Sequence, residues 1–181
     1  MIDGFKLPAD AVCRSNCGVI AVTVAAGLPY KTVENKFRML PRIAKKKGRW
    51  TGGTSEKERL EVMDAMGLEY EALEVMGMTL NRFCNDIAQR NELYMVTTTQ
   101  HVQLVYKDNY GVIWYLDQQG LFDRDSRARA FRKRISNRGY GKPLRIIGGI
   151  MGSSKTVLTT ELLPPVAIEM AKYRTQLNFN F

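Results

Sequence analysis

The chain has 181 residues, with 27 lysines and arginines against 18 aspartates and glutamates, so its formal net charge at pH 7 is +9 with histidine neutral. This length corresponds to one domain, or to one domain with an appendage. A hydrophobic content of 45% excludes a chain that is disordered throughout. The longest uncharged apolar run, 18–29, is too short to span a bilayer and follows no basic segment, so we expect no membrane anchor and no secretory signal peptide.

The cysteines narrow the class of protein further. Cys13, Cys17 and Cys84 are an odd number without the spacing of a disulfide framework, which argues against a secreted, disulfide-stabilised domain. With a single histidine in the chain, Cys13 and Cys17 supply too few ligands for a structural zinc site. We therefore expect no metal and an intracellular or particle-bound protein.

The stretch 11–28 predicts a buried helix that begins with a cysteine. Asn16 is a favourable N-cap residue, Cys17 is then the first helical residue, and Gly27 ends the helix. The residues between them are apolar on almost every side of the predicted helix, which is typical of a core helix. Because the N-terminal end of a helix favours negative charge, this position lowers the pKa of the thiol and favours the nucleophilic thiolate.

The only histidine, His101, lies in a predicted set of three antiparallel strands. We expect these strands at 93–99, 101–107 and 111–117, with a turn at 108–111. His101 begins the second strand and Asp117 ends the third, so the hairpin places them roughly opposite each other. An acid there can orient the imidazole, which can deprotonate Cys17. Cys13 is the competing nucleophile, but no helix follows it to stabilise its thiolate.

The matched stretches Asn16-Cys17-Gly18, Gln100-His101-Val102 and Tyr115-Leu116-Asp117 resemble the papain-like cysteine peptidases. The nearest branch is the compact one that includes bacteriocin-processing peptidases and many phage or bacterial peptidase-like proteins. The resemblance covers roughly residues 10–120. It implies an α+β fold in which N-terminal helices carrying the cysteine pack on a small antiparallel sheet carrying the histidine and the aspartate. It also implies acyl transfer on a peptide or amide bond of a peptide or protein substrate, without metal or organic cofactor.

The rest of the chain supports this order of helices first and sheet second. We expect a papain-like domain over 1–121 and a basic C-terminal extension over 122–181, either separate or packed on the same domain. Cys84 lies on the apolar face of a predicted helix and is interpreted as a core residue. The remaining elements are expected as helices at 30–40, 56–66, 80–90, 124–138 and 160–172 and as strands at 69–75 and 144–151.

The oxyanion of the reaction needs hydrogen-bond donors. The Cys17 N–H at the helix start is one donor, and Ser15 or Asn16 is expected to help. The related families usually carry a glutamine several residues before the cysteine, and no glutamine occurs between Met1 and Asn16. Gln118 and Gln119 are other candidate donors. A catalytically inactive papain-like structural or adaptor protein therefore stays open as an alternative.

Most of the positive charge lies in two segments, 42–49 and 124–145. In the second segment we expect contacts with nucleic acid or an acidic protein, and the alternative is a solvated helix face. The candidate contact residues are Arg127, Arg129, Arg132, Lys133 and Arg134. A basic nucleic-acid-binding module is the second alternative function. By analogy with phage relatives, we expect a protein of the host-cell cytoplasm or a virion component.

Overall fold

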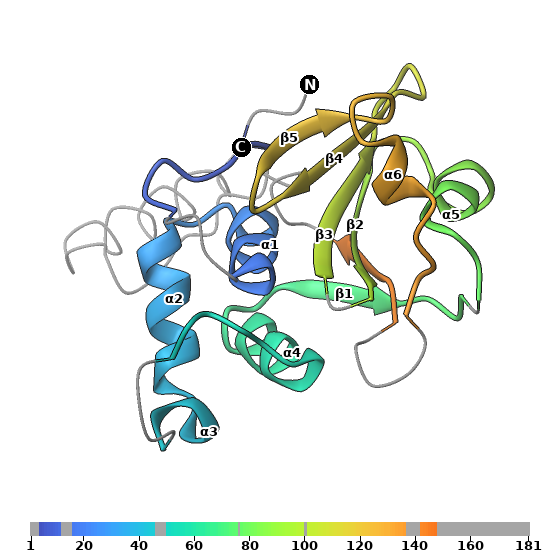
Figure 1. Ribbon diagram of the computed structural model, residues 1–181. Coiled ribbons are helices and arrows are strands. Elements are labelled where there is room, and N and C mark those ends of the chain that lie inside the picture. Colours follow the sequence, from blue (N-terminus) through green and yellow to red (C-terminus); the bar gives the residue numbers. More distant parts are fainter. Residues whose placement is uncertain are drawn as a thin grey trace, which may run out of the picture.

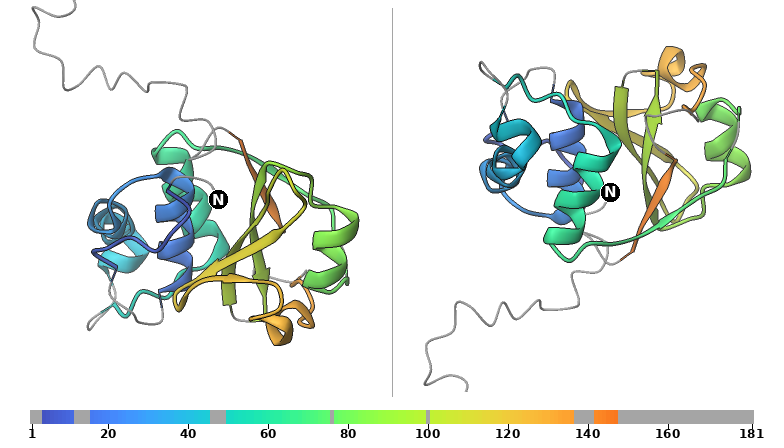
Figure 2. Two further views of the ribbon diagram at one scale, coloured as in Figure 1. Left: turned by 90° about the horizontal axis from the view of Figure 1, so that it is seen from above. Right: turned by 90° about the horizontal axis from the view of Figure 1, so that it is seen from below.

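The computed structural model describes residues 4–11, 16–45, 50–75, 77–99, 101–136 and 142–147. Within these ranges the chain has an α+β architecture, with helices on both faces of one antiparallel sheet (Figures 1 and 2). In chain order the elements are α1 (Cys17–Ala26), α2 (Tyr30–Met39), α3 (Pro41–Ala44), α4 (Glu56–Ala65), β1 (Glu69–Ala72), α5 (Leu80–Asp86), β2 (Glu92–Thr98), β3 (His101–Lys107), β4 (Ile113–Asp117), β5 (Gly120–Asp123), α6 (Ala128–Phe131) and β6 (Leu144–Ile147).

The sheet has six strands in the order β1-β6-β2-β3-β4-β5, and every neighbouring pair is antiparallel. Helices α1, α2 and α4 cover one face, and α5 and α6 cover the other (Figure 2). β6 comes last in the described chain, yet it lies between β1 and β2 inside the sheet. Residues on both sides of position 121 therefore belong to one sheet, and the proposed domain division there stays a prediction.

Helix α1 lies in the middle of the larger hydrophobic core, between the sheet and α2 (Figure 1). Its side chains are buried from Gly18 through Ala25, as expected for a helix that is apolar on every side. Gly27 ends it as predicted, with a left-handed φ of 66° that glycine adopts without steric cost. Across from α1, Leu104 and Tyr106 of β3 complete this core. The site-bearing end of α1 is thus fixed against the sheet.

A smaller core fills the opposite face of the sheet, under α5 and α6. Phe83 and Cys84 of α5 pack there with Tyr115 and Phe131, and Cys84 is confirmed as a core residue. Helix α5 ends at Asp86, earlier than predicted. At this end the Nζ of Lys107 in β3 donates hydrogen bonds to the carbonyls of Cys84 and Ala88 at 3.1 and 3.0 Å, as basic side chains commonly do at the C-terminal end of a helix.

The prediction of a helix over 124–138 is wrong for residues 124–136, which are the part of this range that the structure describes. Only the four residues of α6 are helical in this part, and before them the chain forms a turn in which Asp123 accepts a hydrogen bond from the Ser126 N–H. After α6 the chain follows the sheet: the Ile135 N–H donates to the Met78 carbonyl, and Ile135 forms a β-bridge with Thr98. Tertiary contacts of buried apolar residues here override local helix propensity.

The other predicted elements correspond to observed ones, with ends that differ by a few residues. The three strands around His101 are confirmed as β2, β3 and β4, and the strand expected at 69–75 as β1. The predicted helix at 160–172 lies outside the described residues. In the part of the chain that the structure describes, no helix combines the length and the apolar content that crossing a membrane requires.

Candidate active site

Cys17 is the first residue of α1, and its thiol is partly exposed. The Val102 N–H of β3 donates to the Cys17 Sγ at 3.5 Å. Asn16 occupies the N-cap position as predicted, but its side chain makes no capping hydrogen bond and instead donates from Nδ2 to the Tyr30 hydroxyl at 2.7 Å. The first N–H groups of α1 are therefore not capped by Asn16, and they provide a site that favours negative charge.

The residue after the cysteine must be small. A methyl group on Gly18 would overlap the hydroxyl of Thr54 and press on the side chain of Arg59. Gly18 therefore lets the segment before α4 approach the first turn of α1 closely. This contact brings a second helix, and its arginine, beside the thiol.

His101 begins β3, directly before the residue whose N–H contacts the Cys17 sulfur. Its Nε2 lies 3.1 Å from Asp117 Oδ2, and the ring also hydrogen-bonds the Cys17 thiol. Because Nε2 faces the carboxylate, Nδ1 is the ring nitrogen left to exchange a proton with the thiol. Cys17 and His101, which lie far apart in the sequence, thus meet at the end of the sheet.

Asp117 ends β4, and it is buried. Its Oδ2 also accepts the Tyr115 hydroxyl at 3.1 Å, and its Oδ1 accepts the Gln119 N–H at 2.7 Å. The ladder pairs Leu104 with Leu116, so Asp117 reaches His101 along a diagonal rather than from directly opposite. These hydrogen bonds fix the carboxylate, and the carboxylate fixes the ring.

The electrostatics of the three groups favour a thiolate beside an imidazolium. Burial acts to raise the pKa of Cys17, but hydrogen bonds from His101 and the Val102 N–H, together with nearby positive charge, outweigh it and lower that pKa. The hydrogen bonds to Asp117 and then to Cys17 raise the pKa of His101 to about 9. Burial likewise opposes ionisation of Asp117, yet the bonds from His101 and the Gln119 N–H hold its pKa below the usual range.

The sequence analysis missed one residue of the site, Arg59. This α4 arginine is 4% exposed and donates to the Thr54 carbonyl at 3.3 Å and to Thr97 Oγ1 at 3.4 Å. Its positive charge helps to lower the pKa of Cys17, while burial lowers its own pKa. The sequence does contain a signal: Arg59 precedes Val62 and Met63 at helical spacing, which places an arginine on the buried face.

The structure describes some of the proposed oxyanion donors but not all of them. Ser15 lies outside the described residues, as do Cys13 and the residue before His101. Asn16 is buried, with its Nδ2 directed to Tyr30. The backbone N–H of Gln119 donates to Asp117, and the Gln119 side-chain oxygen accepts a hydrogen bond from Arg127. The N–H groups at the start of α1 receive no side-chain cap from Asn16 and stay candidate oxyanion donors.

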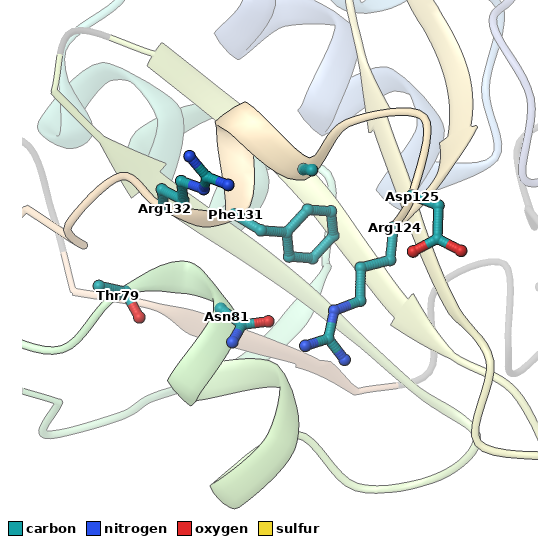
Figure 3. Close-up of a pocket in the computed structure, with 7 residues that line it drawn as sticks. Thr79, Asn81, Arg124, Asp125, Phe131 and Arg132 are labelled. Atoms are coloured by element: carbon teal, nitrogen blue, oxygen red, sulfur yellow. The ribbon is translucent and has the colours of Figure 1, made fainter.

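Beside His101 lies a hollow of about 490 Å³, which we call the basic hollow. Its lining includes His101, Asp117, Gln119, Arg127, Arg129 and Lys133. Of the five basic residues predicted as contacts, three therefore line this hollow. Arg132 lines another hollow, of about 320 Å³, where Figure 3 shows it and Arg124 on either side of Phe131. Arg134 is exposed and lines neither hollow.

Across the described ranges, no three side chains of His, Cys, Asp or Glu gather in an arrangement that holds a metal ion.

Comparison of the chain with protein-family models and with curated proteins finds no match.

Proposed function

We propose that this chain is a papain-like hydrolase of the cysteine peptidase type, which acts on a peptide or amide bond through Cys17, His101 and Asp117. The observation that carries the proposal is the continuous set of contacts from Asp117 Oδ2 to His101 Nε2 at 3.1 Å, and from the His101 ring and the Val102 N–H to the Cys17 sulfur. A nucleophile, a base and a group that orients the base form the minimal set for this chemistry.

In the proposed reaction the Cys17 thiolate attacks the carbonyl carbon, and the carbonyl oxygen gains negative charge at the N-terminus of α1. His101 then gives its proton to the leaving nitrogen, the C–N bond breaks, and a thioester to Cys17 remains. His101 next takes a proton from a water molecule that attacks the thioester. The C–S bond breaks, the acid is released, and the thiolate and the imidazolium are restored. Asp117 holds the imidazole and stabilises its charged form.

The order of elements also supports the papain-like interpretation. A cysteine begins a buried helix, and a histidine and an aspartate follow on strands of an antiparallel sheet packed against that helix. In this interpretation the N–H groups of α1 and the buried cation Arg59 supply positive potential where the related families use an upstream glutamine. The source among phages and a place in the virion stay part of the proposal and rest on analogy.

The test is the rate of alkylation of each cysteine by iodoacetamide as a function of pH, followed by peptide mass spectrometry in the wild type and in His101→Ala. We expect Cys17 to react fastest, at pH values well below the unperturbed thiol pKa of about 8.5, and to lose this advantage in His101→Ala. Cys84 provides the internal control, because its thiol is buried.

If Cys17 titrates like an ordinary thiol in the wild type, the hydrolase proposal is wrong, and the inactive scaffold is favoured instead. If Cys17 is activated, hydrolysis of a mixed peptide library, with Cys17→Ala as the blank, identifies the bond that is cut. The nucleic-acid-binding alternative predicts affinity for DNA or RNA that falls steeply with salt, whatever the state of Cys17.

A further inference from the structure

Among the described residues that line the basic hollow, positive side chains outnumber negative ones. Among the described residues that line it, Asp117 is the one carboxylate, and this carboxylate is already engaged with His101, Tyr115 and the Gln119 N–H. Arg127 lies 4.0 Å from the other oxygen of Asp117, donates to the Gln119 side chain, and covers the Phe122 ring at 3.8 Å. Arg127 therefore forms a wall of the hollow that is held in place by Asp117, Gln119 and Phe122.

Two other cations of the lining have no such partner. Arg129 and Lys133 are exposed, and among the residues that the structure describes neither side chain has an ion pair or hydrogen bond. The backbone that carries them is nevertheless held in place. Phe131, between them, is 2% exposed in the smaller core, and the Lys133 carbonyl accepts the Leu80 N–H at 2.9 Å. Two unpaired positive charges are thus presented by an anchored segment next to His101.

We propose that the basic hollow is a substrate subsite that binds an acidic side chain, Asp or Glu, of a peptide whose scissile carbonyl lies at Cys17. This inference rests on the proposed function and names its substrate class. Arg129 and Lys133 supply the charge-assisted hydrogen bonds to the carboxylate, and the Gln119 side chain and Arg127 form the polar wall. The volume of about 490 Å³ lies within the range of ligand pockets and is large enough for one side chain.

A peptide carboxylate fits these residues better than a nucleic-acid backbone. A nucleic-acid strand is followed by a row of cations along its phosphates. Here the other cations of the same segment diverge: Arg132 lines the hollow beside Phe131 (Figure 3), and Arg134 lines neither hollow. The cations that do converge, Arg127, Arg129 and Lys133, line the same hollow as His101, which is a placement that selects a substrate residue close to the cleaved bond.

The test uses tripeptide acyloxymethyl ketones, which alkylate an activated thiol with loss of a carboxylate. The probes are made in pairs that carry Glu or Gln at the same position within an alanine background, and labelling of Cys17 is followed by mass spectrometry at fixed ionic strength. We expect the Glu probe of at least one pair to label the wild type about tenfold faster than its Gln partner.

The variant Arg129→Gln/Lys133→Gln should bring this Glu/Gln ratio close to one. The matched control, Arg132→Gln/Arg134→Gln, removes the same charge from the same segment and should keep the wild-type ratio. A ratio near one in the wild type, or an equal loss in both double variants, overturns the subsite, because the preference would then be absent or due to net charge.

Two further measurements separate the causes of failure. If iodoacetamide shows an activated Cys17 while the Glu and Gln probes react equally, the subsite is wrong and the proposed function stands. If iodoacetamide shows an ordinary Cys17, the proposed function fails and the subsite fails with it. An added oligo-dT strand at the same ionic strength should leave the Glu/Gln ratio unchanged; a ratio abolished by the strand would assign the hollow to nucleic acid and overturn the inference.

Discussion

Cys17 and Cys84 place the same chemical group on helices over opposite faces of one sheet. The pKa of the Cys17 thiol is lowered, whereas the pKa of the Cys84 thiol is raised. Cys17 begins α1, is partly exposed, and receives hydrogen bonds from the Val102 N–H and His101. Cys84 lies inside α5 and is fully buried, and this burial raises its pKa to about 12 although Arg124 and Lys107 act against the rise.

The difference shows which surroundings lower the pKa of a thiol in this molecule. Burial opposes ionisation at both positions, and both are near positive side chains. Only Cys17 has hydrogen bonds that stabilise the anion itself and a position at the start of its helix. Direct donors to sulfur, more than nearby charge, therefore distinguish the proposed nucleophile from the core residue.

The largest effect on activity is expected from removing the Cys17 thiol, and removal of the Cys84 thiol is the matched control. Cys17→Ala should lower the rate of peptide or amide hydrolysis by about 10⁴-fold or more, because the nucleophile is lost. Cys84→Ala should leave kcat/KM within about twofold and cost about 1 kcal/mol of stability through a small buried cavity. Steady-state kinetics and thermal unfolding of the two variants measure both quantities. Equal activities in the two variants would contradict the assignment of Cys17.

Asp117→Asn should have the next largest effect. The hydrogen bond to Asp117 is the main reason why the pKa of His101 is raised to about 9, so this variant should lower that pKa. The thiolate–imidazolium pair exists above the lowered pKa of Cys17 and below the pKa of His101. The upper limb of the pH–rate profile should therefore move from about pH 9 to lower pH, and kcat should fall by about 10²-fold to 10³-fold.

The lower limb provides the control for Asp117→Asn. It reports the ionisation of Cys17, which the Val102 N–H and Arg59 continue to favour, so it should move less than the upper limb. An upper limb that stays in place would mean that Asp117 does not set the protonation of His101.

A smaller effect is expected from Arg59→Met, which keeps most of the buried volume and removes the charge. The pKa of Cys17 should rise, because the positive charge that favours the thiolate is gone. Alkylation of Cys17 near neutral pH should slow by about twofold to threefold, because Arg59 is the weakest of the influences that lower this pKa. Arg59→Lys retains the charge and should retain most of the alkylation rate. If both variants slow alkylation equally, Arg59 acts through packing and not through its charge.

The sequence predicted the parts of the site that depend on short-range patterns. The start of α1 at Cys17 follows from an N-cap residue before an apolar run, and the strands that carry His101 and Asp117 follow from alternation and turn residues. The meeting of Cys17 with His101 required only that the helix pack on the sheet. The contact between the Cys17 sulfur and the Val102 N–H, beside His101, agrees with this expectation.

The parts that sequence analysis could not provide depend on tertiary contacts. Arg59 comes from a helix that reaches the thiol only because Gly18 allows a close approach. The segment after Asp123 looks helical by composition, but Phe131 and Ile135 are buried in the smaller core, and these contacts shorten the helix to α6. No local pattern in the chain specifies which of its cations converge beside His101.

The smallest effect on activity is expected from a change at the end of α5, close to Cys84. The Lys107 ammonium donates to the carbonyls of Cys84 and Ala88 at the end of α5 and opposes the effect of burial on the Cys84 thiol. Lys107→Met should therefore raise the pKa of Cys84 further and cost about 1–2 kcal/mol of stability, since two buried carbonyls lose their donor. Hydrogen exchange of the last α5 amides should become faster in the variant, whereas alkylation of Cys17 and the pH–rate profile should not change. A shift in the titration of Cys17 would mean that the two faces of the sheet are coupled, and the opposite behaviour of the two thiols could then not be assigned to their immediate surroundings.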